Sequence, residues 1–281
     1  MKIVSEIGLL QELIGSFKKE GKTVGFVPTM GYLHEGHLSL VDRATKENDI
    51  VVMSIFVNPL QFGPNEDFDK YPRDFDRDKQ LAENANVDIL FFPQVADMYP
   101  SESAMKIAVT QGVDVLCGKS RPGHFDGVAT VVLKLFNIVT PERAYFGMKD
   151  AQQVAVIEML VRDFNLAVEV VPCDTLREED GLAKSSRNVN LTTTERKEAP
   201  VIYKSLLQAK DMIRQGESNT ETVVQSIITS IVDVTSGELD YVQVLTYPEL
   251  QQITQLKGRI IIAVALKYSS ARLIDNLTFD V

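Results

Sequence analysis

Two of the three histidines in this 281-residue chain stand in one short motif, PTMGYLHEGH, at residues 28–37. His34 and His37 are three residues apart, so in a helical turn their imidazoles lie on one face. Gly31 and Gly36 allow the backbone to bend sharply and to approach a ligand closely. Imidazoles held in this way can donate hydrogen bonds to phosphate oxygens as charge develops in a transition state. A helix-capping turn with packed histidines is the alternative, but the pairing of histidines with glycines favours a functional site.

Two further motifs carry cations and backbone donors. The sequence GLAKSSRN at residues 181–188 places two cations and two hydroxyls in four residues, which is a combination able to hold a triphosphate. The sequence FGMKDAQQ at residues 146–153 offers backbone N–H groups at Gly147 and Met148, with Lys149 in reach of a phosphate. Alone, the first also fits a solvated turn and the second an ordinary helix start with Asp150 as the cap.

Polar residues also follow the apolar run at residues 50–57. In VNPLQF (residues 57–62), Asn58 and Gln61 can hydrogen-bond a polar substrate, although a simple Asn-Pro turn explains the motif nearly as well. In RPGHFDG (residues 121–127), His124 and its neighbours fit either a salt-bridged surface loop or a lid over the substrate.

A zinc site at His34 and His37 is a weaker interpretation, because His-x-x-His lacks the spacing of the usual helical zinc motif, and Cys117 and Cys173 are isolated.

The first 174 residues alternate between strand and helix patterns. Strands are predicted at residues 23–27, 50–57, 88–92, 106–109 and 144–146, and helices at residues 36–46, 74–84, 127–139 and 150–163. This alternation predicts an α/β fold with a Rossmann-like, doubly wound parallel sheet. Ligands of such sheets bind beyond the carboxyl ends of the strands, which is where the histidine motif falls.

The pattern changes after about residue 174. Helices are predicted at residues 193–215 and 220–234, followed by strands at residues 239–245, 259–267 and 271–279. We therefore predict two domains, residues 1–174 and residues 175–281, the second a smaller α+β domain that carries the Lys-Ser-Ser-Arg sequence and closes over the site. The charged segment at residues 63–78 is predicted as an exposed loop that runs into a helix.

Composition limits the partners of the protein. With 29 basic and 39 acidic side chains the formal charge is −10, which disfavours broad binding to a nucleic-acid backbone but permits one small anion. No apolar stretch approaches the ~20 residues that span a bilayer. Glu6 and Glu12 interrupt the N-terminal segment where a signal peptide needs an apolar core. We expect a cytoplasmic protein whose cysteines are reduced, with neither membrane nor nucleic acid as a partner.

Taken together, five motifs resemble one family. PTMGYLHEGH, FVNPLQFGPNEDFDKYPR, RPGHFDGVATVV, YFGMKDAQQ and LAKSSRN stand in the order and spacing of the pantoate–β-alanine ligases, a family of the class I nucleotidyl-transfer superfamily. The resemblance covers essentially the whole chain. It implies an ATP-dependent, AMP-forming ligase that joins (R)-pantoate to β-alanine through a pantoyl adenylate, yielding pantothenate, AMP and pyrophosphate. It also implies Mg²⁺ with the triphosphate, with no protein ligand identified, and a homodimer.

The resemblance also implies roles for individual residues. His37 would be the proton donor; we interpret His34 and His37, both catalytic, chiefly as stabilisers of transition-state charge. Gln61 and Gln153 would hold pantoate, with Asn58 beside them and Gln61 also bordering β-alanine. The ATP contacts would be Met30, Gly31, Tyr32, Leu33, His34, Glu35, Gly36, His37, Gly147, Met148, Lys149, Asp150, Leu176, Lys184, Ser185, Ser186 and Arg187.

Three other functions share part of this pattern. A nucleotidylyltransferase of the same superfamily would keep the histidine motif but lack the NPLQF and GMKDAQQ sequences. A fragment of a class I aminoacyl-tRNA synthetase would need a surface for tRNA, which the charge of −10 disfavours. A non-catalytic nucleotide-binding module would have no use for paired histidines beside a Lys-Ser-Ser-Arg sequence.

Overall fold

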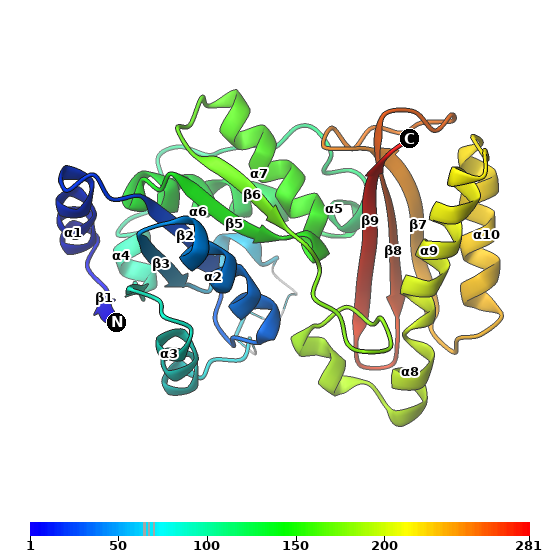
Figure 1. Cartoon of the computed structure of the whole chain (residues 1–281), viewed down its shortest axis with the longest axis horizontal. Coiled ribbons are helices and arrows are strands. Elements are labelled where there is room, and N and C mark those ends of the chain that lie inside the picture. The colour runs from blue at the N-terminus through cyan, green and yellow to red at the C-terminus, as the bar shows by residue number, and fades with distance from the viewer. Residues whose placement is uncertain (64–65, 67, 70) are drawn as a thin grey trace. The chain divides into compact units, whose positions relative to one another are not determined.

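The computed structural model describes residues 1–63, 66, 68–69 and 71–281 (Figure 1). The chain divides into two compact units, which are described separately. Unit 1 comprises Met1–Thr110, Arg121–Gly147 and Val156–Cys173. Unit 2 comprises Gln111–Ser120, Met148–Ala155 and Asp174–Val281.

The described residues of unit 1 form a six-stranded parallel sheet in the order β1-β4-β3-β2-β5-β6. The strands are β1 (Lys2–Val4), β2 (Val24–Thr29), β3 (Ile50–Ile55), β4 (Ile89–Phe91), β5 (Arg143–Gly147) and β6 (Glu169–Cys173). β2 pairs with β3 without a shift from Val24–Ile50 to Thr29–Ile55. The segments that follow these two strands therefore leave the same edge of the sheet.

Helices cover both faces of this sheet. Alternate side chains of a strand point to opposite faces, and Val27, Val51 and Met53 belong to one core cluster with residues of α2 (Glu35–Glu47) and α3 (Phe75–Asn84). On the other face, Phe146 contacts Phe136 of α6 (His124–Val139), with ring centroids 6.3 Å apart. Among the described residues, the other helices of unit 1 are α1 (Ile7–Lys19), α4 (Val95–Met98) and, from Val156 onward, α7 (Ala151–Asp163). The doubly wound α/β fold predicted from the sequence is confirmed, and burial on both faces explains why the strands are continuous apolar runs.

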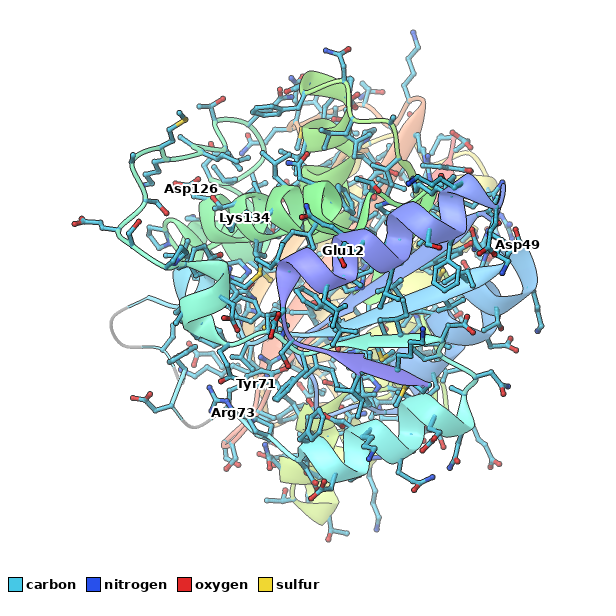
Figure 2. All side chains as sticks on the ribbon, turned by 90° about the vertical axis from the view of Figure 1, so that its left-hand side faces the viewer. Glu12, Asp49, Tyr71, Arg73, Asp126 and Lys134 are labelled. Carbon is cyan, nitrogen blue, oxygen red and sulfur yellow. The ribbon has the colours of Figure 1, made fainter. Side chains whose placement is uncertain are left out.

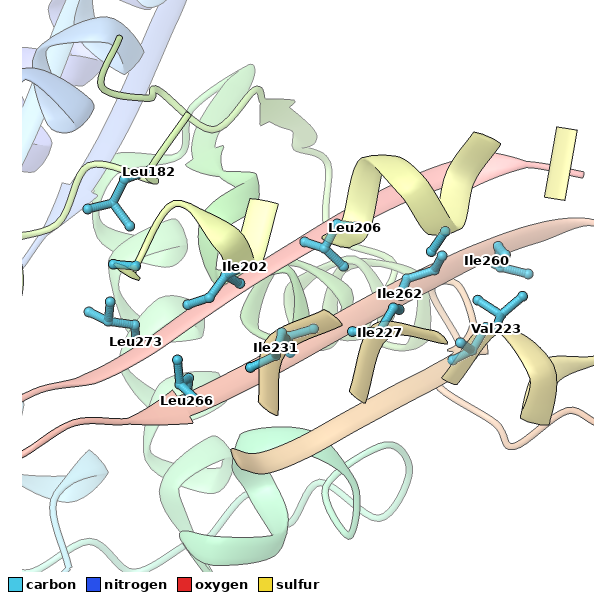
Figure 3. Packing of buried hydrophobic residues seen from close by; sticks show 14 of the residues in the cluster. Leu182, Ile202, Leu206, Val223, Ile227, Ile231, Ile260, Ile262, Leu266 and Leu273 are labelled. Atoms are coloured by element: carbon cyan, nitrogen blue, oxygen red, sulfur yellow. The ribbon is translucent and has the colours of Figure 1, made fainter. Parts of the chain in front are cut away.

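Unit 2 is built on an antiparallel sheet of β7 (Glu238–Thr246), β8 (Arg259–Lys267) and β9 (Arg272–Asp280). One face of β8 presents Ile260, Ile262, Val264 and Leu266 to a core shared with Leu206 and Ile227 (Figure 3). These last two residues come from α9 (Val201–Arg214) and α10 (Thr220–Val232), which α8 (Thr193–Glu198) precedes. The smaller α+β part of the predicted fold is thereby confirmed.

The division of the chain differs from the two predicted domains. Residues 111–120 and 148–155 lie within the predicted first domain but belong to unit 2. The backbone N–H of Leu116, which begins α5 (Leu116–Ser120), donates to Gln243 Oε1 at 2.9 Å. Asn276 Nδ2 donates to the carbonyl oxygens of Met148 at 2.9 Å and Lys149 at 3.0 Å. Polar side chains of β7 and β9 thus bind these two segments. Such contacts join residues far apart in the chain, so a local sequence pattern does not predict them.

Several predicted elements differ from the structure. No strand forms at residues 106–109, because the backbone N–H of Val109 donates to Asp126 Oδ1 at 2.9 Å rather than to a neighbouring strand. The helix expected over residues 193–215 is divided into α8 and α9 around Pro200, which lacks a backbone N–H. β1, α1 and β6 were not predicted. Of the loop expected at residues 63–78, residues 64, 65, 67 and 70 lie outside the described residues, and α3 begins at Phe75.

Candidate active site

The histidine turn, defined here as Met30–His37, follows β2 directly and contains two left-handed backbone conformations. Gly31 has φ +83° and Tyr32 has φ +50°. A Cβ atom at Gly31 would lie 2.9 Å from Ile55 Cγ2 and 3.0 Å from Asp78 Oδ2, so glycine is needed both for the conformation and for the space. The turn is therefore tightly packed against the end of β3 and against α3.

Asp78 of α3 anchors the histidine turn through two hydrogen bonds. Its carboxylate accepts from the backbone N–H of Tyr32 at 2.6 Å and of Leu33 at 2.7 Å, while the residue is 1 % exposed. A buried carboxylate requires such partners, because an unpaired charge in the interior is costly. Asp78 thus fixes the backbone just ahead of the two histidines.

The two histidine rings cap the start of α2 and lie against each other, with centroids 4.0 Å apart. His34 Nδ1 accepts from the backbone N–H of Gly36 at 3.1 Å, and His37 Nδ1 accepts from the backbone N–H of His34 at 3.3 Å. Because a backbone N–H can only donate, the proton of each neutral imidazole is assigned to Nε2. Both rings then present an Nε2–H donor at a helix N-terminus, where the macrodipole also favours an anion.

Other residues of the histidine turn are placed differently. Leu33 is fully buried in the core beside the sheet, so its side chain packs and only its backbone can face a ligand. Tyr32 lies under the guanidinium of Arg77, 5.3 Å from Cζ to the ring centroid, and Glu35 is exposed. Met30 contacts the next loop of the sheet edge through its sulfur, which lies close to the amide of Gln61.

That loop carries Asn58 and Gln61, with Gln61 at the end of η1 (Pro59–Gln61), just past β3. Gln61 Nε2 lies 3.0 Å from Met30 Sδ, so the structure brings two of the predicted binding segments together. Asn58 is 1 % exposed; its Nδ2 donates to Gly127 O at 3.0 Å and to Gln61 Oε1 at 3.3 Å, and its Oδ1 accepts from Leu60 N at 3.3 Å. The polar atoms of Asn58 are therefore engaged within the protein, and its contribution is to hold Gln61.

The predicted residues from Met148 onward belong to unit 2, whereas Gly147 ends β5 in unit 1. Met148, Lys149 and Asp150 form η2, whose first two carbonyl oxygens are bound by the buried Asn276. Lys149 Nζ lies 3.6 Å from Asp150 Oδ2. Gln153 is half-buried in the first turn of α7, and the structure records no contact that assigns it a ligand role.

The cationic loop, defined here as Lys184–Arg187, is also in unit 2 and leads into η3 (Ser186–Asn190). The backbone N–H of Lys184 donates to Leu176 O at 2.9 Å, which joins two of the predicted ATP contacts. Ser185 Oγ caps η3 by accepting from the N–H of Arg187 at 3.3 Å, and Arg187 is exposed. Ser185 and Lys149 line the same small cavity, so within unit 2 the cationic loop and η2 are neighbours.

Sequence reasoning missed Asp78 and Asn276. Asp78 and Ala82 are the buried residues of α3 and are four residues apart, so an acidic side chain occupies the core-facing stripe of an amphipathic helix. That position is the signal that could have revealed it, since a buried aspartate needs partners. Asn276 is likewise a buried polar residue, in the middle of β9.

A family model and curated proteins match nearly the whole of this chain. A family model described as pantoate-beta-alanine ligase matches residues 2–278. The chain is 58 % identical to the pantothenate synthetase of Bacillus velezensis over 281 residues, which cover 100 % of this chain and 98 % of that protein. It is 57 % identical to the pantothenate synthetase of Bacillus subtilis over the same shares.

Solved structures agree with this relationship. The crystal structure of pantothenate synthetase from Thermus thermophilus matches with a TM-score of 0.91 and 46 % identity, covering 99 % of each chain. The pantoate-beta-alanine ligase from Francisella tularensis, crystallised with beta-gamma ATP and beta-alanine, matches with a TM-score of 0.77 and 40 % identity, covering 99 % of this chain and 97 % of that one.

Proposed function

Because the chain belongs to the pantoate–β-alanine ligase family, we propose that it catalyses the ATP-dependent condensation of (R)-pantoate with β-alanine to pantothenate, AMP and pyrophosphate. The single observation that carries the proposal is the family match over residues 2–278. The Nε2–H donors of His34 and His37 at the N-terminus of α2 support it, because that arrangement suits a nucleotide phosphate.

The first step of the proposed reaction is adenylation. A pantoate carboxylate oxygen attacks the α-phosphorus of ATP, a new O–P bond forms, and the bond to the β-phosphate breaks to release pyrophosphate. Charge accumulates on the phosphate oxygens, and in this proposal the imidazole donors of His34 and His37 stabilise it. Adenylation is needed because a carboxylate is a poor electrophile, whereas the mixed anhydride carries a good leaving group.

The second step is acyl transfer. The uncharged amine of β-alanine attacks the carbonyl carbon of pantoyl adenylate, the C–O bond to AMP breaks, and the amide forms with loss of a proton. Gln61 and Gln153 hold pantoate in this proposal, and Asn58 keeps Gln61 in place through its hydrogen bond. Holding the two reactants in a fixed geometry supplies much of the rate enhancement of such a step.

ATP is bound, in this proposal, by the histidine turn, by Gly147–Asp150, by Leu176 and by the cationic loop. Each contributes a different kind of donor: imidazole and backbone N–H groups from the first, a lysine and backbone N–H groups from the second, and two cations with two hydroxyls from the last.

Mg²⁺ is proposed to enter with the triphosphate. The described residues contain no group of three or more His, Cys, Asp or Glu side chains arranged to hold a metal ion. The carboxylate of Asp78 is already engaged by two backbone N–H groups. The described residues therefore form no dedicated metal site, and the ion would be held by the triphosphate itself.

A homodimer, which the resemblance to the family implies, and a cytoplasmic location are further proposals. No helix formed by the described residues is long and apolar enough to cross a membrane. Light scattering coupled to size exclusion tests the dimer, and fractionation of the source cells tests the location.

The decisive experiment supplies the protein with ATP, Mg²⁺ and pantoate labelled with ¹⁸O in its carboxylate. Without β-alanine, pantoate-dependent exchange of labelled pyrophosphate into ATP is expected. With β-alanine, pantothenate should form and AMP should carry one ¹⁸O atom from pantoate. AMP formation that does not depend on pantoate, or the absence of AMP under all conditions, would overturn the proposal. A dinucleotide product from a mononucleotide and ATP would instead support the nucleotidylyltransferase alternative.

A further inference from the structure

The segment that carries Gln61 is packed directly on the first turns of α6. A side chain at Gly127 would overlap the carbonyl group of Leu60, so the two backbones approach as closely as glycine allows. Asn58 Nδ2 bridges the same gap by donating to Gly127 O at 3.0 Å. Tyr99 strengthens the contact: its hydroxyl donates to Asn58 Oδ1 at 2.9 Å, and burial raises the pKa of this phenol to about 12. The loop therefore takes its shape from α6.

His124, the first residue of α6, holds the backbone of Gln61 itself. Its Nδ1 lies 2.8 Å from Gln61 O, and its Nε2 lies 3.1 Å from Arg121 Nη1. A guanidinium can only donate, so Nε2 must accept from it and the imidazole proton must be on Nδ1. His124 Nδ1–H therefore donates to the carbonyl oxygen of Gln61, in the tautomer opposite to that of His34 and His37.

Arg121 is held in turn by a bidentate ion pair with Glu66. Its Nε and Nη2 lie 2.7 Å and 2.6 Å from the two carboxylate oxygens, and Nη2 also reaches Gln61 O at 3.4 Å. Hydrogen bonds from Arg121 hold the pKa of Glu66 below its usual range. A chain of polar contacts thus runs from Glu66 through Arg121 and His124 to Gln61.

We propose that His124 and Arg121 are positioning residues for Gln61 and thereby set the affinity for pantoate. This inference rests on the proposed function, in which Gln61 binds pantoate. The main chain of Gln61 is fixed by His124 on one side, while its amide meets Met30 Sδ at 3.0 Å on the other. A shift of the carbonyl would also move the side-chain amide, because both groups belong to the same residue, and that residue is 7 % exposed.

Direct contact of His124 with a ligand is the competing role. His124 lines a cavity of about 610 Å³ together with Gln61, Tyr99 and Thr130, all within unit 1. The geometry favours the positioning role, because His124 already donates to Gln61 O and accepts from Arg121. The two roles predict different responses to a matched pair of substitutions.

The test compares His124→Asn with His124→Gln. The amide nitrogen of asparagine can occupy the place of Nδ1 and keep the hydrogen bond to Gln61 O, whereas that of glutamine reaches the place of Nε2 and loses it. His124→Gln is expected to raise the KM for pantoate about tenfold, the worth of one hydrogen bond, while the KM for ATP changes less than about twofold. His124→Asn should restore most of the affinity, and Arg121→Lys should raise the same KM.

Controls separate the possible failures. Asn137→Ala, at an exposed position of α6, should leave every KM unchanged. Equal kinetic loss in His124→Asn and His124→Gln, or equal increases in the KM for pantoate and for ATP, would overturn the positioning role. Thermal unfolding of each variant identifies a loss that is due only to stability. If the unsubstituted enzyme forms no pantothenate, the proposed function fails; if it does and the pair behaves alike, only this inference fails.

Discussion

The histidine turn in unit 1 and the cationic loop in unit 2 are held in opposite ways. The first is anchored by the buried carboxylate of Asp78, which is 45 and 46 residues from the backbone groups that it binds. The second is held by its neighbours in sequence: Ser185 caps Arg187, and Asn188 Nδ2 donates to Ala183 O at 3.0 Å. The histidine turn thus has a remote anchor in addition to its local caps, whereas the contacts described for the cationic loop come from residues close in sequence.

This difference matches what each region is proposed to do. Imidazole donors that stabilise a transition state must lie within a fraction of an ångström of the right place, so they benefit from a rigid, remote anchor. Lysine and arginine attract phosphate as charges on long side chains and tolerate larger shifts. Lys134 on α6, labelled in Figure 2, is another lysine whose charge lies near a partner without a hydrogen bond between them: its Nζ is 5.4 Å from the ring centroid of Tyr99.

The largest effect is expected for His37→Ala. Removing one preorganised donor should lower the rate of adenylate formation about 10²- to 10³-fold while the fold stays intact. Pantoate-dependent pyrophosphate exchange measures the rate, and circular dichroism checks the fold. His37→Gln should recover part of the loss, because its amide nitrogen can take the place of Nε2. Unchanged turnover in His37→Ala would remove the proposed role of this residue.

Asp78→Asn is expected to have the next largest effect. The amide can accept one backbone N–H but turns its own N–H₂ toward the other, so the unfolding free energy should fall by about 1–3 kcal/mol. Turnover should fall with it, because the histidine turn loses its anchor. Chemical denaturation and steady-state kinetics measure the two losses. Glu83→Gln, at an exposed position of the same helix, should change neither; a stable and fully active Asp78→Asn would refute the anchoring role.

Ser185→Ala tests how the cationic loop is held and what it contributes to ATP binding. Since the cap is local and close to solvent, stability should change by less than about 0.5 kcal/mol. The KM for ATP should rise about two- to tenfold, which corresponds to the loss of one hydrogen bond. Isothermal titration with a non-hydrolysable ATP analogue measures the affinity directly. A large loss of stability would show that the cationic loop is held more firmly than its contacts indicate.

Glu195→Gln should have the smallest effect on turnover, whereas its effect on stability should depend on pH. Hydrogen bonds from the backbone N–H groups of Thr192 and Ser269 lower the pKa of Glu195 to about 2, against about 4.3 in an unfolded chain. A lowered pKa contributes stability above the unfolded value that is lost as the pH falls toward the folded value. The stability deficit of Glu195→Gln should thus be full above about pH 5 and shrink toward about pH 2. Thermal unfolding across this range measures it, with exposed Glu238→Gln as the control; a deficit independent of pH would contradict the assignment.

Sequence reasoning succeeded where the signal was local. The apolar run at residues 50–57 predicted β3 because burial on both faces leaves no polar alternation. The histidine motif was correctly placed at the start of a helix, since its glycines and capping side chains act within a few residues. The strand predicted at residues 106–109 is wrong, because the backbone N–H of Val109 donates to Asp126 and is not available to a neighbouring strand.

By itself, then, the sequence determined the doubly wound sheet, the smaller α+β part and the family of the chain, because apolar periodicity and motif spacing are properties of neighbouring residues. Tertiary structure alone decided that Asp78 supports the histidine turn, that His124 holds Gln61, and that residues 111–120 and 148–155 pack with unit 2. Each of these rests on a hydrogen bond or a packing contact between segments far apart in the chain. Such pairings depend on how the elements fold together, so no stretch of local sequence encodes them.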